Sequence, residues 1–277
     1  MFTLNCKGKL VVIDKPIVMG IINITPDSFH ASSRQQGRDG ILAQAEKMIN
    51  DGAAILDIGG QSTRPGAGLI SAEAEMERVI PAIEAIHQQF PDAILSIDTF
   101  NANVAKASVE AGCSIVNDIS GGIMDPNMLA TVAALRVPYV CMHMQGTPAS
   151  MQAKPAYEDV VKEILDFLIE RVEACRLAGI NDVIIDPGIG FGKTMAHNYE
   201  LIKQLSIFKM LEKPMLLGVS RKGFIRKTLY VDTNHALNGT TVLNTIGLMN
   251  GAHILRVHDV KEAVEAVKLY EAVYGEK

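Results

Sequence analysis

The chain has little cysteine and no long apolar run. Its four cysteines, Cys6, Cys113, Cys141 and Cys175, are far apart and form no CxxC pair. This argues against a disulfide framework or a structural zinc site and favours reduced thiols. No stretch approaches the roughly 18 apolar residues of a membrane span, and the first residues lack the long apolar region of a signal peptide. We therefore expect a cytoplasmic protein.

An excess of positive charge is also absent. The formal net charge is −5, so the broad basic footprint of a nucleic-acid-binding protein is missing. We expect neither nucleic acid nor a membrane as a partner. A protein of this charge can still bind a small anion where its cations are gathered in one place.

Short apolar runs alternate with longer amphipathic segments through most of the chain. Residues 2–13, which turn at Lys7–Gly8, predict a short β-hairpin ahead of the first run. Eight runs predict buried strands, at 17–22, 54–58, 94–97, 114–116, 139–142, 183–185, 215–219 and 253–257. The segments between and after them predict helices at 40–50, 73–89, 101–111, 127–135, 157–177, 197–205, 236–249 and 260–273.

Eight buried strands, each followed by a helix, predict parallel βαβ units with both faces of the sheet covered. Eight such units favour a closed (β/α)8 TIM barrel, with an open doubly wound sheet as the alternative. No linker or composition shift divides the sequence. We therefore expect residues 1–277 to form one domain, with 1–15 as an N-terminal hairpin.

Polar side chains follow every one of the eight runs. In a barrel these positions share the C-terminal mouth, where active sites lie. A single Asp or Asn there could merely cap the next helix, but capping does not explain all eight. Carboxylates and an amide suit a flat polar ring, and cations suit a phosphate or diphosphate. The ring-binding candidates are Asp98, Asn117 and Asp186, and the cations are Arg64, Lys222, Arg256 and His258.

The segment Ile55–Gly66, ILDIGGQSTRPG, changes from a buried strand to a polar loop within a few residues. Asp57 ends the apolar run, and we expect it to belong to the hydrogen-bonded scaffold of the mouth. Gly59–Gly66 is predicted to be a flap at the mouth, because its glycines permit both motion and tight turns. Its polar residues suit a small, polar and anionic ligand.

Two other motifs have ordinary explanations. Residues 187–194, PGIGFGKT, nearly match a phosphate-binding P-loop, but Pro187 stands where the first glycine is required. Lys193 likewise stands where a dinucleotide fingerprint needs its last glycine. We expect this loop to fold over the mouth instead. No partner histidine lies at ligand spacing from His143, so we expect a hydrogen-bonded histidine at a strand end and not a metal ligand.

Taken together, the motifs resemble those of the dihydropteroate synthases, the folate-biosynthesis enzymes that sulfonamides inhibit. The resemblance runs from Met19 to His258 and beyond. It is carried by MGIINITPDSF at 19–29, DIGGQSTRPGA at 57–67, SIDTF at 96–100, IVNDISG at 115–121, CMHMQGTP at 141–148, DPGIGFGK at 186–193, GVSRKGF at 218–224 and ILRVHDV at 254–260.

The resemblance implies a pterin-binding TIM-barrel transferase that uses Mg²⁺ and forms a homodimer. Its reaction would condense 6-hydroxymethyl-7,8-dihydropterin diphosphate with 4-aminobenzoate to give 7,8-dihydropteroate and diphosphate. Such enzymes are thought to need no enzyme nucleophile. Diphosphate leaves, a resonance-stabilised pterin-methyl cation forms, and the arylamine attacks it. The protein then contributes positioning and electrostatic stabilisation.

The resemblance also implies the role of each site residue. Catalysis would depend on Asp186, Lys222, Arg64 and Asp27. The 4-aminobenzoate would be bound by Thr63, Arg64, Pro65, Phe191 and Ser220. The pterin diphosphate would be bound by Asp98, Asn117, Ile119, Met142, Asp186, Lys222, Arg256, His258 and Asn23, and Asn23 would also contact Mg²⁺.

Three positions depart from the family pattern. Ala31 stands about where the first loop usually has a second acidic residue, Gln61 replaces a glutamate, and Gly223 replaces a serine that commonly follows SRK. The altered first loop leaves open a pterin-binding paralogue without synthase activity. A methyltetrahydrofolate-dependent methyltransferase is a second enzyme alternative, but it has no need of the segments 63–65 and 220–222.

Overall fold

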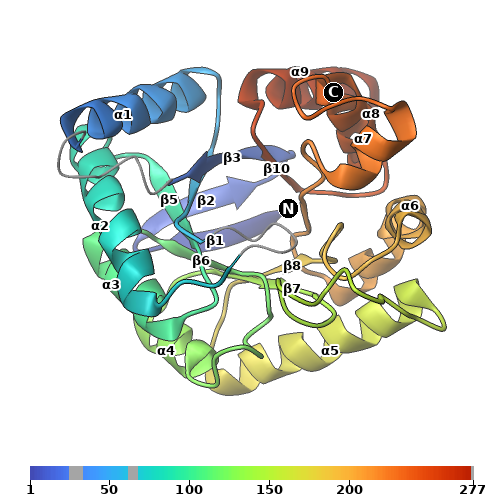
Figure 1. Ribbon diagram of the computed structural model, residues 1–277, viewed down its shortest axis with the longest axis horizontal. Coiled ribbons are helices and arrows are strands. Elements are labelled where there is room, and N and C mark those ends of the chain that lie inside the picture. The colour runs from blue at the N-terminus through green and yellow to red at the C-terminus, as the bar shows by residue number, and fades with distance from the viewer. Residues whose placement is uncertain (25–33, 62–67, 276–277) are drawn as a thin grey trace.

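The computed structural model describes residues 1–24, 34–61 and 68–275. In this part of the chain, eight strands form one sheet in the order β8-β7-β6-β5-β4-β3-β10-β9. Met215, just before β9, bridges in parallel to Ile185 of β8 and so brings the two edges of the sheet together. Figure 1 shows the helices arranged around these strands. The TIM-barrel prediction is confirmed, and the open doubly wound sheet is excluded.

Each predicted run overlaps a strand, and each predicted helix overlaps an observed one. The strands of the barrel are β3 (Ile17–Asn23), β4 (Ile55–Gly59), β5 (Ile94–Asp98), β6 (Ile115–Asp118), β7 (Tyr139–Met142), β8 (Val183–Asp186), β9 (Leu216–Leu217) and β10 (Ile254–Val257). The helices are α1 (Arg34–Asn50), α2 (Ala72–Gln89), α3 (Ala102–Ala111), α4 (Met128–Leu135), α5 (Val160–Ala178), α6 (Met195–Lys203), the 3₁₀ helix η2 (Leu205–Leu211), α7 (Gly223–Leu229), α8 (Leu237–Met249) and α9 (Val260–Tyr274).

Some boundaries differ from the prediction. Helix α5 begins at Val160 and not at 157, because the Asp159 side chain accepts hydrogen bonds from the backbone N–H groups of Val161 and Lys162, each at 3.0 Å, and so caps the helix. Helix α1 begins before residue 40. The sequence prediction missed η2 and α7, since both are only 7 residues long and so give a weak periodic signal.

The seventh strand is also shorter than predicted. Strand β9 contains only Leu216 and Leu217, whereas the apolar run extends to Val219. After Gly218 the chain turns, and the backbone N–H of Lys222 donates to the carbonyl of Val219 at 3.2 Å. The end of the run therefore belongs to a turn at the barrel mouth.

A short antiparallel hairpin, β1 (Phe2–Cys6) and β2 (Lys9–Ile13), closes the N-terminal end of the barrel. Both residues of its turn, Lys7 and Gly8, have positive φ angles. The Lys7 ammonium donates to the carbonyl of Val109 at 2.8 Å, which ties the turn to α3. The hairpin side chains Leu4, Cys6 and Ile13 form one buried cluster, the floor of the barrel, with Met19, Ile55, Ile115, Val140, Ile184, Leu216 and Ile254.

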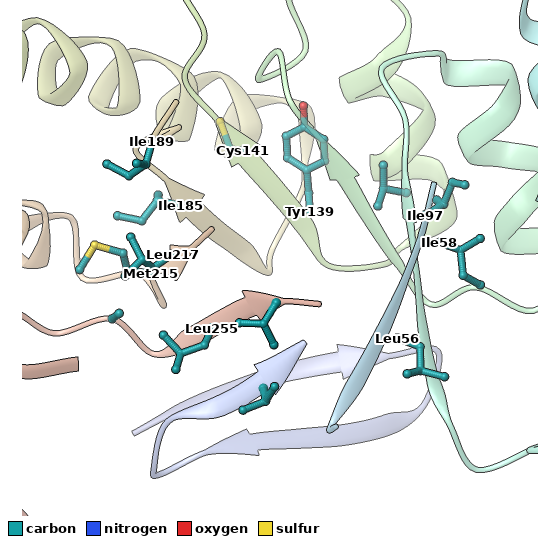
Figure 2. Close-up of a cluster of buried hydrophobic side chains, with 14 of the residues drawn as sticks. Leu56, Ile58, Ile97, Tyr139, Cys141, Ile185, Ile189, Met215, Leu217 and Leu255 are labelled. Carbon is teal, nitrogen blue, oxygen red and sulfur yellow. The ribbon is translucent and has the colours of Figure 1, made fainter. Parts of the chain in front are cut away.

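The alternation of side chains along each strand places the polar residues. On β4, Ile55 belongs to the floor, whereas Leu56 and Ile58 belong to the larger apolar cluster between strands and helices. Figure 2 shows Leu56 and Ile58 among the side chains of that larger cluster. Because successive side chains point to opposite faces of a strand, Asp57 points into the barrel, one layer above Ile55. The same spacing relates Arg256 on β10 to Ile254.

All four cysteines are free thiols and are buried. Burial raises the pKa of Cys6 to about 12, so its thiol stays protonated at neutral pH. None of the helices in residues 1–24, 34–61 and 68–275 is long and apolar enough to cross a membrane.

We predict that replacement of Leu4 by alanine destabilises the barrel. Leu4 is 1% exposed and packs in the floor, and truncating such a side chain costs about 2–5 kcal/mol of unfolding free energy. Urea denaturation measures the loss. Leu10, on the same hairpin but 65% exposed, is the matched control. Equal effects of Leu4→Ala and Leu10→Ala would show that the hairpin does not stabilise the barrel.

Candidate active site

One arginine links four of the barrel strands at the mouth. The Arg256 Nε atom on β10 donates to Asp57 Oδ2 on β4 at 2.6 Å, and its Nη2 atom donates to Asp98 Oδ2 on β5 at 2.6 Å. The amide of Asn117 on β6 donates to the same Asp57 oxygen at 3.0 Å. Asp57 is fully buried, and these bonds confirm its predicted place in the hydrogen-bonded scaffold.

Two buried carboxylates share this one guanidinium, so the cluster carries excess negative charge. Burial raises the pKa of Asp98, Arg256 opposes that shift and the neighbouring Asp57 adds to it, and together they bring the pKa to about 7. Burial alone would lower the pKa of Arg256, but the carboxylates of Asp57 and Asp98 raise it. The guanidinium is therefore always charged, whereas Asp98 is close to its titration point at neutral pH.

Asp186 and Lys222 form a second charged pair at the mouth. The backbone N–H of Gly188 donates to Asp186 Oδ1 at 2.7 Å. Burial raises the pKa of Asp186, and Lys222 opposes that shift. Burial lowers the pKa of Lys222 to about 8. The Lys222 ammonium donates to the carbonyl of Ile189 and lies 4.7 Å from the centroid of the Phe191 ring, which is a cation–π geometry.

An apolar surface lies beside these charges. Phe100, Ile119 and Met142 form a small buried cluster, and Met124, Met144 and Phe191 pack against it. An apolar wall next to a few convergent polar groups is typical of a site for a flat ring. Phe100 was not among the predicted site residues, although its spacing of two residues from Asp98 could have suggested it.

At the ends of β9 and β10, Ser220 and His258 are joined. The Ser220 Oγ atom lies 2.9 Å from His258 Nδ1 and accepts from the His258 backbone N–H at 3.2 Å. Arg221 has a left-handed backbone, with φ of 55°. Its guanidinium makes two hydrogen bonds to Asp259, at 2.8 and 2.5 Å. Arg221 therefore has a structural role between two neighbouring βα loops.

The loop after β8 packs between the β7 loop and Lys222. Gly188, Gly190 and Gly192 have φ angles of 70°, 88° and 62°, and a Cβ at Gly188 would lie 1.9 Å from the carbonyl oxygen of His143. These glycines are therefore required by the packing of the loop. At the start of α6, the backbone N–H groups are capped by Thr194 and His197 in a capping box, which fits the expectation that this stretch is not a P-loop.

Gln61 bridges the two ends of the predicted flap. Its Oε1 atom accepts from the backbone N–H of Ile70 at 2.9 Å, and its Nε2 atom donates to the carbonyl of Gly68 at 3.2 Å. A glutamate, usual in the family here, could accept the first hydrogen bond but could not donate the second. The substitution therefore adds a direct link across the base of the loop.

The other two departures from the family pattern are at Gly223 and Ala31. At Gly223, the first residue of α7, an added Cβ would meet nothing closer than 3.6 Å, so the site has room for serine. Ala31 lies outside the described residues. Four predicted site residues also lie outside them, namely Asp27, Thr63, Arg64 and Pro65, and with them most of the predicted flap Gly59–Gly66.

The described candidates meet at one end of the barrel. Asn23 ends β3, is exposed, and pairs in register with Gly59, which pairs with Asp98. Met142 pairs with Asp186, and Asp98 pairs with Asn117. The set that the structure brings to the mouth comprises Asn23, Asp98, Asn117, Ile119, Met142, Asp186, Phe191, Ser220, Lys222, Arg256 and His258.

Comparison with known proteins identifies the class to which this site belongs. The model of a family described as "Pterin binding enzyme" matches residues 19–258. The chain is 42% identical to the dihydropteroate synthase of Escherichia coli strain K12 over 276 residues, which are 99% of this chain and 97% of the relative.

Solved structures agree. The Yersinia pestis dihydropteroate synthase in a sulfonamide drug complex superimposes with a TM-score of 0.93 at 42% identity, covering 99% of this chain and 100% of the other. The Xanthomonas albilineans enzyme in complex with 7,8-dihydropteroate has a TM-score of 0.87 at 36% identity, covering 99% of each chain. The chain therefore belongs to the pterin-binding enzyme family and, within it, to the dihydropteroate synthases.

We predict that Asp57→Asn destabilises the protein, because it disrupts the hydrogen-bonded scaffold at the barrel mouth. The substitution removes the charge that pairs with Arg256 and changes the acceptor of Asn117, so unfolding free energy should fall by about 1–3 kcal/mol. Urea denaturation measures the change. Asp92→Asn, at a fully exposed carboxylate, should leave the denaturation curve unchanged. A curve for Asp57→Asn that overlies the parent would contradict the scaffold role of Asp57.

Proposed function

We propose that the chain condenses 6-hydroxymethyl-7,8-dihydropterin diphosphate with 4-aminobenzoate to give 7,8-dihydropteroate and diphosphate. One observation supports this activity more than any other: two clusters of charged side chains lie together at the C-terminal mouth of the barrel. Asp57, Asp98 and Arg256 form one, Asp186 and Lys222 form the other, and an apolar wall lies beside them. Such a pocket suits a polar ring that bears a diphosphate arm.

In this proposal the edge of the pterin ring contacts Asp98, Asn117, Asp186 and Lys222. Carboxylates and an amide oxygen accept from ring and exocyclic N–H groups, and the Lys222 ammonium donates to ring acceptors. Ile119 and Met142, which are both buried, pack against the ring. The planar guanidinium of Arg256 lies across the ring face while Asp57 and Asp98 hold its orientation.

The reaction then needs charge stabilisation and no enzyme nucleophile. The bond between the pterin methyl carbon and the diphosphate oxygen breaks, and its electron pair leaves with diphosphate. The remaining pterin-methyl cation is stabilised by resonance and by the nearby carboxylate of Asp186, and Asp27 is the proposed second acid. The amine of 4-aminobenzoate donates its lone pair to the methyl carbon and then loses a proton. Arg256 and His258 stabilise the departing diphosphate.

The donor set at the mouth fits Mg²⁺ as an ion held mainly by substrate. Asn23 offers one exposed amide oxygen at the end of β3, and the described residues contain no group of three or more His, Cys, Asp or Glu side chains that could hold a metal. Mg²⁺ commonly keeps its waters and binds through one or two protein oxygens and substrate phosphates. Asn23 would supply the protein oxygen, and a bound Mg²⁺ would neutralise diphosphate charge.

The second substrate is proposed to bind on the side of Phe191 and Ser220, opposite the floor. Phe191 offers an aromatic face and Ser220 a hydroxyl, for the ring and the polar ends of 4-aminobenzoate. Thr63, Arg64 and Pro65 would complete this side, with Arg64 as the cation for the carboxylate. We further propose that the chain acts in the cytoplasm and that residues 1–277 form one barrel domain.

The partner of the chain is proposed to be a second copy of itself. Helices α8 and α9 pack against each other, and both expose apolar side chains at helical spacing. On α8 these are Val242, Ile246 and Met249, and on α9 they are Leu269 and Val273. Exposed apolar side chains on two helices that pack together are typical of a protein–protein interface. A homodimer through α8 and α9 would bury it.

Ile246→Glu tests this assembly. A charge in the centre of the apolar surface should convert the dimer to a monomer, because burying an unpaired carboxylate opposes association. Light scattering on a sizing column measures the mass, which we expect to be twice that of one chain for the parent. Leu177→Glu, at an apolar and more exposed position on α5 (72% exposed, against 37% for Ile246), should stay dimeric. A monomeric parent would refute the homodimer.

The proposed activity is tested directly with purified protein. Incubation with the pterin diphosphate, Mg²⁺ and radiolabelled 4-aminobenzoate should yield labelled dihydropteroate. Lys222→Ala and Asp186→Ala should each lose at least about 100-fold in rate, whereas Lys227→Ala, on the exposed face of α7, should not. Wild-type rates in the first two variants would refute the site assignment.

The same assay separates the alternative. A parent protein that binds the pterin, gives no product and fails to rescue a synthase-deficient bacterium would be a binding paralogue without synthase activity.

The two perturbed groups predict a bell-shaped pH dependence. As pH rises through about 7, Asp98 ionises and becomes a proton acceptor for the pterin. As pH rises through about 8, Lys222 loses its proton and its charge. The kcat/KM for the pterin diphosphate should therefore rise through the first value and fall above the second. Lys222→Arg should remove the alkaline limb, because arginine stays charged up to about pH 12. A flat profile from pH 6 to about 9 would contradict both assignments.

A further inference from the structure

Lys193 lies almost completely buried at the end of the glycine-rich loop, with 2% of its surface exposed. Its ammonium contacts three acceptors. They are His143 Nδ1 at 3.0 Å, the carbonyl of Phe191 at 2.9 Å and the carbonyl of His143 at 3.4 Å. Lysine is almost never fully buried unless it is paired, so this contact set calls for an explanation beyond packing.

The three contacts define the protonation of both partners. An ammonium has three N–H donors and no acceptor, and three acceptors surround it here. Burial lowers the pKa of Lys193 well below its usual range, and the Asp186 carboxylate opposes that shift. With Lys193 as the ammonium that the two carbonyl acceptors favour, His143 Nδ1 presents its lone pair and the histidine proton is on Nε2. The His143 ring is buried and packs edge-on against Phe167, with ring centroids 4.8 Å apart. Burial and the neighbouring Lys193 lower the pKa of His143 to about 2, in agreement with a neutral ring.

The pair joins two neighbouring strand ends to the proposed aminobenzoate side. His143 directly follows β7, and Lys193 ends the loop that follows β8. The carbonyl that Lys193 holds belongs to Phe191, whose ring lies 4.7 Å from the Lys222 ammonium. The same loop is held at Gly192, where the Tyr157 hydroxyl donates to the carbonyl at 2.8 Å. Lys193 therefore links His143 at the end of β7 to the backbone of Phe191.

We propose that Lys193, bound to a neutral Nε2-protonated His143, is a positioning residue that fixes the Phe191 ring beside Lys222 for the aromatic second substrate. This proposal rests on the proposed function, because it assigns a specificity role within the same site. Lys193 itself touches neither substrate. Its removal should loosen Phe191 while Asp98, Asn117 and Arg256, which it does not contact, keep their positions.

Steady-state kinetics of Lys193→Met test the role. Methionine has a similar length but no donor, so the KM for 4-aminobenzoate should rise about tenfold. The KM for the pterin diphosphate should rise less, because Lys193 affects the pterin side only through the charge that it presents to Asp186. Lys203→Met, at an exposed lysine on α6, should behave as the parent.

His143→Asn keeps an acceptor for Lys193 and should retain most of the aminobenzoate affinity, whereas His143→Leu should resemble Lys193→Met. Unchanged or equally raised KM values in Lys193→Met would overturn the proposal.

A second measurement does not depend on activity. In ¹⁵N-histidine NMR spectra, with His143→Asn used for assignment, the His143 ring should stay neutral and protonated at Nε2 from pH 5 to about 9. Titration of His143 in this range, or a proton on Nδ1, would overturn the proposal. If the NMR result holds and the parent makes no product, the proposed function fails and the Lys193–His143 pairing stands.

Discussion

The sharing of one guanidinium by two buried carboxylates is the constraint on which the site depends. Arg256 is charged under all conditions, and burial of that charge is tolerable only because Asp57 and Asp98 lie within 2.6 Å of its nitrogens. Burial raises the pKa of Asp98 and the shared arginine opposes that shift, so the pKa is about 7. Asp57, which Arg256 holds, in turn accepts from the amide of Asn117. The floor, the strand order and the register all serve to bring these four side chains together.

The barrel supplies this geometry through a simple repeat. Several strands contribute one apolar residue to the floor and, two residues later, one polar or small residue to the layer above it, whereas Ile21 on β3 and Met142 on β7 are apolar at that position. Ile55 and Asp57, Ile115 and Asn117, and Ile184 and Asp186 follow this spacing. The hairpin below fills the floor, so the upper layer opens only toward the C-terminal mouth. A site for a polar ring thus follows from the alternation of a parallel strand.

The sequence was sufficient to predict the eight strands, the barrel, Asp57 as scaffold and the residues that end each strand, because those signals are local and periodic. It could not predict α7 and η2, which are only 7 residues long, or the short length of β9, whose apolar run continues into a turn. The sequence also could not predict which side chains of distant loops contact each other. Nothing in the spacing of His143 and Lys193, or of Arg221 and Asp259, indicates that their side chains meet.

A crystal structure of the chain with 7,8-dihydropteroate bound would test the central claim most directly. The account predicts a pterin ring edge within hydrogen-bonding distance of Asp98, Asn117, Asp186 and Lys222, with Arg256 across its face and still bonded to Asp57. The aminobenzoate half should lie beside Phe191 and Ser220. A pterin bound elsewhere, or an Arg256 side chain that leaves Asp57 and Asp98 when the ligand binds, would contradict it.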